Sequence, residues 1–185
     1  MIMVYMLLAD GFEEIEAIAP LDILRRANIE TSTVSLTRDP FVNGGHDIAV
    51  IADLSIDEVD FESIDMLVLP GGGLGVDTIS KSTAAMDLIA RTWKADKLLA
   101  AICAAPSLLA KLDILDGMSV ICHPSVADVV SVAGGKLHPD APVVCDGNLI
   151  TGVAAGASID FGLKLVEVLR GGEASENLRK SLHYV

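Results

Sequence analysis

Residues 98–106 read LLAAICAAP, a stretch that places a buried strand directly before a helix. The first half is an apolar run of strand length, and Pro106 suits the first turn of a helix, where no backbone N–H is needed. Cys103 therefore lies in the sharp turn between the two elements. The small residues Ala101 and Ala105 on either side allow the close backbone approach that a nucleophile elbow requires. This strand–turn–helix unit predicts a parallel sheet that displays a thiol at its carboxyl edge.

Apolar runs of strand length alternate with helical patterns along the rest of the chain. Strands are predicted at residues 3–8, 31–36, 48–51, 66–69, 98–102 and 118–121, with a hairpin over 143–151. Helices are predicted at residues 15–27, 83–94, 106–112, 124–133 and 157–169. Continuous apolar strands that alternate with helices indicate a sheet covered on both faces. We therefore predict a three-layer α/β/α sandwich with a mainly parallel central sheet, formed by one domain over residues 1–185.

The composition excludes several classes of function. A formal net charge of −13 disfavours binding to nucleic acid or to an anionic membrane surface, because both partners are themselves negative. Two of the longest uncharged stretches, 98–110 and 147–159, are shorter than the roughly 20 residues that a spanning helix needs. The first residues lack the basic region of a secretory signal, and three cysteines do not make a disulfide framework. A cytoplasmic protein is expected.

Cys103 is the first candidate for chemistry. The amino end of the following helix is expected to stabilise a thiolate and to lower the pKa of the thiol below its usual value of about 8.5. The alternative is a buried, inert cysteine, since cysteine is among the most buried residue types. Cys122 and Cys145 do not lie at such an elbow and are expected to be small buried residues.

An acidic stretch follows the first predicted strand, with the sequence DGFEEIE at residues 10–16. Glu13 and Glu14 are expected to be solvated partners of the helix dipole. Glu16 lies toward the apolar side of the helix, so we expect it to be partly desolvated and its pKa to be raised. A protonated carboxyl group beside a thiolate donates a hydrogen bond and later moves protons. The alternative for Glu16 is an ordinary role at the helix terminus.

Two further elements belong to the same predicted edge. The turn LPGGGLG at residues 69–75 presents backbone N–H groups, notably at Gly72 and Gly73, and is suited to an oxyanion hole; alternatively it is only a tight turn. It matches neither a dinucleotide fingerprint nor a Walker loop. His123 follows the strand at 118–121 and is a candidate base or proton shuttle, or else a structural or solvated histidine.

The remaining histidines, His46, His138 and His183, show no partner pattern. Neither Cys-x-x-Cys nor His-x-x-x-His occurs, so no metal is expected.

In this order and at these spacings, the motifs resemble the ThiJ/PfpI superfamily, also called the DJ-one family, and within it the DJ-one/YajL-like branch. The resemblance covers essentially the whole chain. The segments that carry it are residues 10–16, 20–27, 68–75, 101–106 and 151–158. It implies a flavodoxin-like sandwich of the class I glutamine amidotransferase type, usually a homodimer.

For the site, the resemblance implies that Cys103 is the reactive thiol and that Glu16 is the acid bonded to it. It implies further that Gly72 and Ala104 lend backbone N–H groups and that His123 is the family's nearby histidine. The peptidase-like branch has a histidine where this chain has Ala104, and some members have an arginine where it has Val153.

Three functions follow from these residues. The first is a glyoxalase or protein deglycase that acts on methylglyoxal, glyoxal, or glycated thiols and amines, with no cofactor. Cys103 would form a hemithioacetal, and Glu16, with or without His123, would transfer protons. The second is a redox sensor or stress-response chaperone, because an accessible reactive thiol oxidises to sulfenic and sulfinic acid. The third, a cysteine peptidase or amidase, is disfavoured by Ala104.

Overall fold

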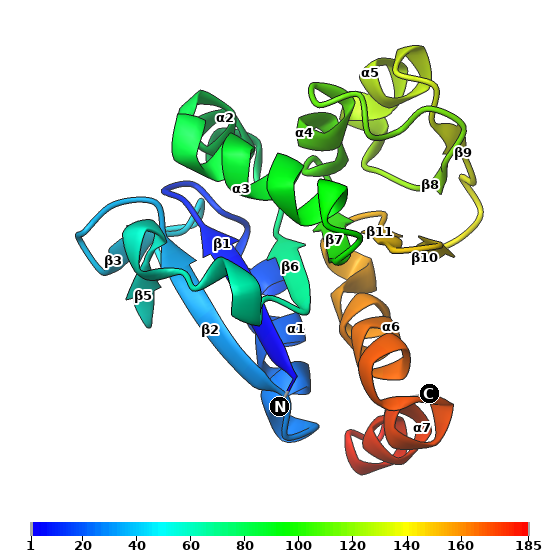
Figure 1. The fold of residues 1–185 in the computed structure, drawn as a ribbon. Helices are drawn as coiled ribbons and strands as arrows, with labels where there is room; N and C mark the ends of the chain where they lie inside the picture. Colours follow the sequence, from blue (N-terminus) through cyan, green and yellow to red (C-terminus); the bar gives the residue numbers. More distant parts are fainter. Residues whose placement is uncertain (1, 185) are drawn as a thin grey trace.

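The protein is built around a mostly parallel sheet, shown in Figure 1. The computed structural model describes residues 2–184 and, within them, a seven-stranded sheet of order β10-β11-β7-β6-β1-β2-β5. β10 is antiparallel to β11, and the other neighbours are parallel. The strands are β1 (Met3–Leu8), β2 (Glu30–Ser35), β5 (Leu54–Ser55), β6 (Met66–Leu69), β7 (Leu98–Ile102), β10 (Val143–Asp146) and β11 (Leu149–Gly152). The predicted class is confirmed.

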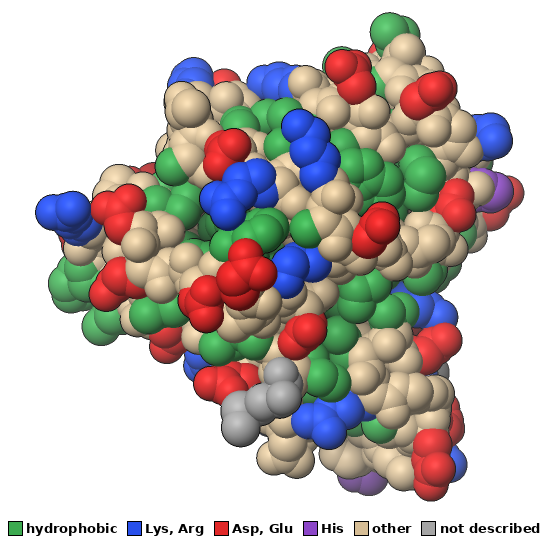
Figure 2. Space-filling view, viewed as in Figure 1, with side chains coloured by type: hydrophobic (Ala, Val, Ile, Leu, Met, Phe, Trp, Pro, Cys, Tyr) green, Lys and Arg blue, Asp and Glu red, His purple; other side chains and the backbone are tan. Residues whose placement is uncertain are grey.

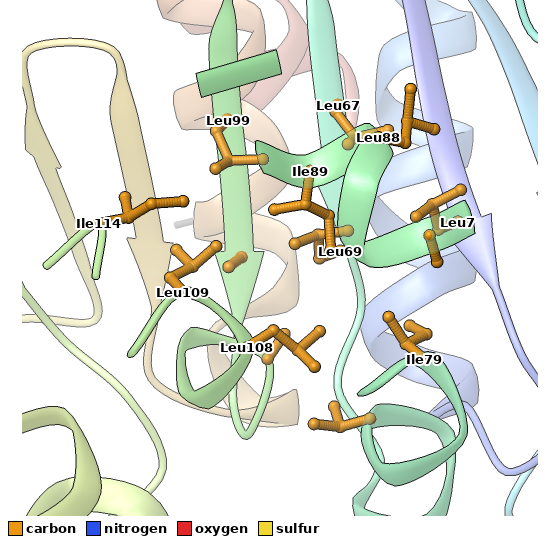
Figure 3. Packing of buried hydrophobic residues seen from close by; sticks show 14 of the residues in the cluster. Leu7, Leu67, Leu69, Ile79, Leu88, Ile89, Leu99, Leu108, Leu109 and Ile114 are labelled. Carbon is orange, nitrogen blue, oxygen red and sulfur yellow. The ribbon is translucent and has the colours of Figure 1, made fainter. Parts of the chain in front are cut away.

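Helices cover both faces of this sheet. α1 (Glu14–Arg26) and α6 (Ser158–Arg170) pack on one face, and α2 (Gly73–Lys81), α3 (Thr83–Lys94) and α4 (Pro106–Ala110) cover the other. Alternate residues of each strand point to opposite faces, so every central strand contributes to both apolar clusters. In β1, Met6 packs toward α1 and α6 and Leu7 toward α3. Figure 3 shows the cluster on the face that α3 covers, in which Leu67, Leu69 and Leu99 of the sheet meet Leu88 and Ile89 of α3.

Some elements differ from the sequence-based expectation. The strand predicted at 48–51 is β4 (Ala49–Ile51), which pairs with β3 (Phe41–Asn43) in a separate hairpin instead of joining the main sheet. The strand predicted at 118–121 is β8 (Ser119–Val120), paired with β9 (Lys136–Leu137). The helix predicted at 124–133 is a 3₁₀ turn, Pro124–Val126, followed by α5 (Ala127–Val132). The remaining elements are two short 3₁₀ turns, Ile56–Glu58 and Phe61–Ser63, a third at Ala155–Ala157, and α7 (Gly172–Ser181).

The surface of the molecule carries charges of both signs. Figure 2 shows basic and acidic side chains interspersed over the face on which α3 lies. Within residues 2–184, no helix is long and apolar enough to cross a membrane.

Phe161 of α6 tests the packing of the layer that contains α1 and α6. Its side chain is fully buried, and Gly152 of β11 leaves the space that its ring occupies. We expect Phe161→Ala to lower the free energy of unfolding by about 3–5 kcal/mol, because the ring leaves a cavity among close-packed neighbours. Urea denaturation measures this change. The exposed α7 variant Glu173→Ala should stay within about 0.5 kcal/mol of the wild type, and equal losses in the two variants would contradict the packing described.

Candidate active site

Cys103 occupies a strained turn at the carboxyl edge of β7. Its φ is 64°, a left-handed conformation that costs a residue with a side chain on the order of 1–3 kcal/mol. Ala101 and Ala105 are fully buried, as the elbow requires. The Cys103 N–H donates to the Gly152 carbonyl at 2.9 Å, and its carbonyl accepts the His123 N–H at 2.8 Å. The backbone is thus held on both sides, and the half-buried thiol projects from the sheet.

Glu16 of α1 brings a carboxyl group to this thiol. The residue is 1% exposed, and Oε2 accepts the Gly71 N–H at 3.0 Å. The carboxyl group also accepts the Ala155 N–H and shares a hydrogen bond with the Cys103 side chain. A side chain in place of Gly71 would collide with the Glu16 carboxyl group and with Cys103, so glycine is required there. Glu16 and Cys103 therefore form a contact pair, as the resemblance implied.

The proton balance of the pair is partly as predicted. Burial raises the pKa of Glu16 to about 7, which confirms the expected direction. Burial, together with the adjacent Glu16 carboxylate, raises the pKa of Cys103 to about 12, so the expected lowering is wrong. Desolvation of the thiolate outweighs the donors around it, and α4 is a helix of only five residues. Near neutral pH, the pair therefore keeps a proton on the thiol while Glu16 titrates.

Two backbone N–H groups face the sulfur. The N–H groups of Gly72 and Ala104 donate to Cys103 Sγ and partly offset the cost of a charge there. Gly72 has a φ of 94°, and a side chain at this position would collide with Gly11 and Glu13. The neighbouring Gly73 is the first residue of α2. The glycine turn therefore lies against the loop after β1 and presents donors where a negative charge would develop.

A cavity of about 380 Å³ opens beside Cys103. Its lining residues are Gly11, Phe12, Glu13, Gly45, His46, Gly72, Gly73, Leu74 and Cys103.

His123, the histidine expected to assist the thiol, turns its ring to Ser125, whose Oγ lies 2.8 Å from Nδ1. The same nitrogen accepts the Ser125 N–H and caps the following 3₁₀ turn. The structure brings Cys103, Glu16, Gly72 and Ala104 together but connects His123 to Cys103 only through its backbone.

His46 lines this cavity, although the sequence offered no partner for it. Its Nδ1 lies 2.7 Å from Glu14 Oε2, and its backbone N–H donates to Oε1 at 2.6 Å. Glu14 is 6% exposed, so its predicted solvated role is wrong. Burial raises the pKa of Glu14, but the hydrogen bonds from His46 outweigh that effect and lower it. The pair joins residues 32 positions apart, and only the two glycines before His46 hinted at a turn there.

One group of candidate ligands lies beside the cavity, around Glu14 and His46. Glu13, Glu14 and His46 each offer an atom within 4.8 Å of the others, and both oxygens of Glu14 accept hydrogen bonds from His46. Cys122 is buried, as predicted. Cys145 is exposed on the edge strand β10, which corrects the expectation that it is buried.

Comparisons with known proteins show what the chain as a whole resembles. The family model described as the DJ-1/PfpI family matches residues 3–181. Protein dj-1beta of Drosophila melanogaster is 36% identical over 176 residues, which cover 95% of this chain and 94% of that protein. The glutathione-independent glyoxalase DJ-1 of Schizosaccharomyces pombe is 34% identical over 190 residues and covers 98% of each chain. The crystal structure of Drosophila DJ-1beta matches with a TM-score of 0.94 at 35% identity, over 100% of this chain and 98% of that one.

The raised pKa of Glu16 predicts a pH-dependent stability. Between pH 4.5 and about 7 the unfolded chain releases the Glu16 proton while the folded protein retains it. The free energy of unfolding of the wild type should therefore fall relative to that of Glu16→Gln as the pH rises, by up to roughly 3 kcal/mol, and stay level above pH 7. Urea denaturation from pH 4 to 8 measures the difference. The exposed Glu173→Gln should follow the wild type, and parallel curves for wild type and Glu16→Gln would contradict the assignment.

Proposed function

Because the chain belongs to the DJ-1/PfpI family, we propose that it converts small dicarbonyls, such as methylglyoxal or glyoxal, into 2-hydroxy acids with Cys103 as the nucleophile. The observation that carries this proposal is the contact of Glu16 with Cys103, beneath two backbone donors and beside a cavity. A relative that matches nearly the full chain bears the name of a glutathione-independent glyoxalase. Thiols and amines that such aldehydes have glycated are the substrates of a deglycase, and they present related carbonyl chemistry.

The pair of Glu16 and Cys103 accounts for the first step without a preformed thiolate. As the sulfur attacks the aldehyde carbon, the thiol proton passes to the Glu16 carboxylate. The carbonyl oxygen takes up negative charge and is met by the N–H groups of Gly72 and Ala104. Glu16 then returns the proton to that oxygen, which leaves a neutral hemithioacetal on Cys103. A carboxyl group with a pKa of about 7 suits this exchange near neutral pH.

The second step moves hydrogen between the two carbons of the substrate. Glu16 removes the proton from the first carbon and delivers it to the second, so that the hemithioacetal becomes a thioester of a 2-hydroxy acid. Water then adds to the thioester carbon, the C–S bond breaks, and the sulfur regains a proton. The sum is the substrate plus one water, with no net oxidation or reduction. A role for His123 as proton carrier stays a prediction, since its ring is engaged by Ser125.

Oxidation sensing is the second candidate for the same residue. Peroxide reacts with a thiolate rather than with a thiol. Burial and the Glu16 carboxylate raise the pKa of Cys103 to about 12, so the sulfur is a thiol near neutral pH. This favours a nucleophile that Glu16 deprotonates during the reaction over a sensor that needs a standing thiolate. A peptidase role ranks third, since Ala104 stands where a base would follow the cysteine.

Turnover of methylglyoxal tests the proposal. We expect the purified wild type to consume methylglyoxal and release lactate, and we expect Cys103→Ser and Glu16→Gln each to lose about 100-fold or more in kcat. The matched control is Cys145→Ser, which alters an exposed thiol on β10 and should turn over at the wild-type rate. Retention of the wild-type rate by Cys103→Ser, or no lactate from the wild type, would overturn the mechanism.

We also propose that the protein forms a homodimer through an isoleucine face, defined by Ile15, Ile18, Ile48 and Ile159. These side chains are 56%, 39%, 57% and 36% exposed, respectively. Ile15 shares a surface cavity with Ile48, and Ile159 shares one with α1. Adjacent exposed apolar side chains of this size typically mark an interface, and a second copy is the partner that the family resemblance favours.

Sedimentation of a variant in this face tests the dimer. Ile18→Asp introduces a charge that cannot be buried without a partner, so we expect it to sediment as a monomer while the wild type sediments as a dimer. Val132→Asp on α5 is the control, because Val132 is 90% exposed and lies outside the isoleucine face. A wild-type monomer, or a dimer that Ile18→Asp leaves intact, would exclude this interface.

A further inference from the structure

The turn of the β3–β4 hairpin holds His46 at a fixed place beside the cavity. The Gly45 N–H donates to the Phe12 carbonyl at 2.8 Å, and the Gly11 N–H donates to the Asn43 carbonyl at 2.7 Å. Both acceptor–donor pairs join the hairpin to the loop that follows β1. His46 and Cys103 therefore line one cavity, although they are far apart in the sequence.

Glu14 orients the imidazole of His46. The two hydrogen bonds that Glu14 accepts fix both the backbone and Nδ1 of the histidine. The carboxylate is 7% exposed at its side chain, whereas the imidazole is 71% exposed. Among residues 2–184, no hydrogen bond reaches Nε2. A buried carboxylate on Nδ1 with a free Nε2 is the arrangement that prepares a histidine to give and take protons.

The charges around His46 favour its protonated form. The hydrogen bond to Glu14 and the negative charges of Glu14, Glu13 and Asp47 raise the pKa of His46. Cys103 lines the same cavity, and Glu16 contacts Cys103. The carboxylates around His46 outnumber its single positive charge, so this part of the cavity does not favour an anionic ligand. To a neutral dicarbonyl, His46 offers an N–H hydrogen-bond donor.

We propose that His46 is a second acid–base residue of this site, which serves the substrate carbonyl farther from Cys103; this inference rests on the proposed function. The substrate has two carbonyl groups, and Glu16 contacts the sulfur that binds the first. With the first carbonyl carbon bound to Cys103, the second carbonyl oxygen would extend into the cavity that Cys103 and His46 both line. His46 is a catalytic residue in this scheme, and Glu14 is its positioning residue.

The proton transfers balance as follows. When Glu16 removes hydrogen from the first carbon of the hemithioacetal, Nε2–H of His46 gives its proton to the second carbonyl oxygen, and an enediol forms. Glu16 then delivers its proton to the second carbon. The hydroxyl on the first carbon returns a proton to Nε2 as its C=O bond forms, which yields the thioester. Both residues end in the state in which they began.

Steady-state kinetics of His46→Asn from pH 5 to 9 test this role. Asparagine keeps a donor for Glu14 but does not titrate. We expect kcat for methylglyoxal to fall by about tenfold or more, with KM little changed, and the limb of the pH profile that belongs to His46 to disappear. Glu14→Gln should move that limb to lower pH, because it removes the charge that raises the pKa of His46. His138→Asn, an exposed loop histidine, should behave as the wild type.

Alkylation of Cys103 by iodoacetamide separates catalysis from structure. The rate of alkylation should be the same in His46→Asn and the wild type, and imidazole added to His46→Ala should restore part of kcat. Wild-type kcat and pH profile in His46→Asn, or a parallel loss of alkylation and turnover, would overturn the inference. If Cys103→Ser is inactive while His46→Asn is fully active, only this inference fails; if Cys103→Ser is active, the proposed function itself fails.

Discussion

The burial of one carboxyl group against one thiol is the constraint on which the rest of the site depends. Glu16 is 1% exposed, and a carboxylate in that position is costly unless donors surround it. The Gly71 and Ala155 N–H groups and the Cys103 side chain supply them. The donors come from the loops that follow β6, β7 and β11, so the pair exists only when these three parallel strands end at one edge.

The same contact sets the chemistry. Two acidic groups in one desolvated place cannot both ionise without cost, so the thiol keeps its proton until a reaction removes it. Cys103 is therefore an unreactive thiol in the free protein, and the base that deprotonates it, Glu16, is already in contact with it. The strained φ of Cys103 is held by hydrogen bonds to Gly152 and His123 and by the close packing at Ala101 and Ala105.

Much of the fold was predictable because its signals are local. The apolar strands β1, β6 and β7 and the helices α1, α3 and α6 have periodic patterns that burial on both faces imposes. α2 was missed because three of its first residues and its cap lie in a glycine turn, and only Val76 and Ile79 carry its apolar face. α7 was missed because its sequence is polar and its main apolar anchor is Leu178, which packs in the cluster of α6. The β3–β4 hairpin depends on contacts with the loop after β1, which no local pattern encodes.

The sequence by itself determined the sheet, the elbow that displays Cys103, and the candidacy of Glu16, because apolar periodicity and small flanking residues are properties of neighbouring positions. Only the tertiary structure decided that the pKa of Cys103 rises, that Glu14 is buried, and that His46 lies beside the cavity. A pKa depends on burial and on charges a few ångströms away. Those surroundings come from segments far apart in the chain, so they are fixed only when the layers of the fold pack together.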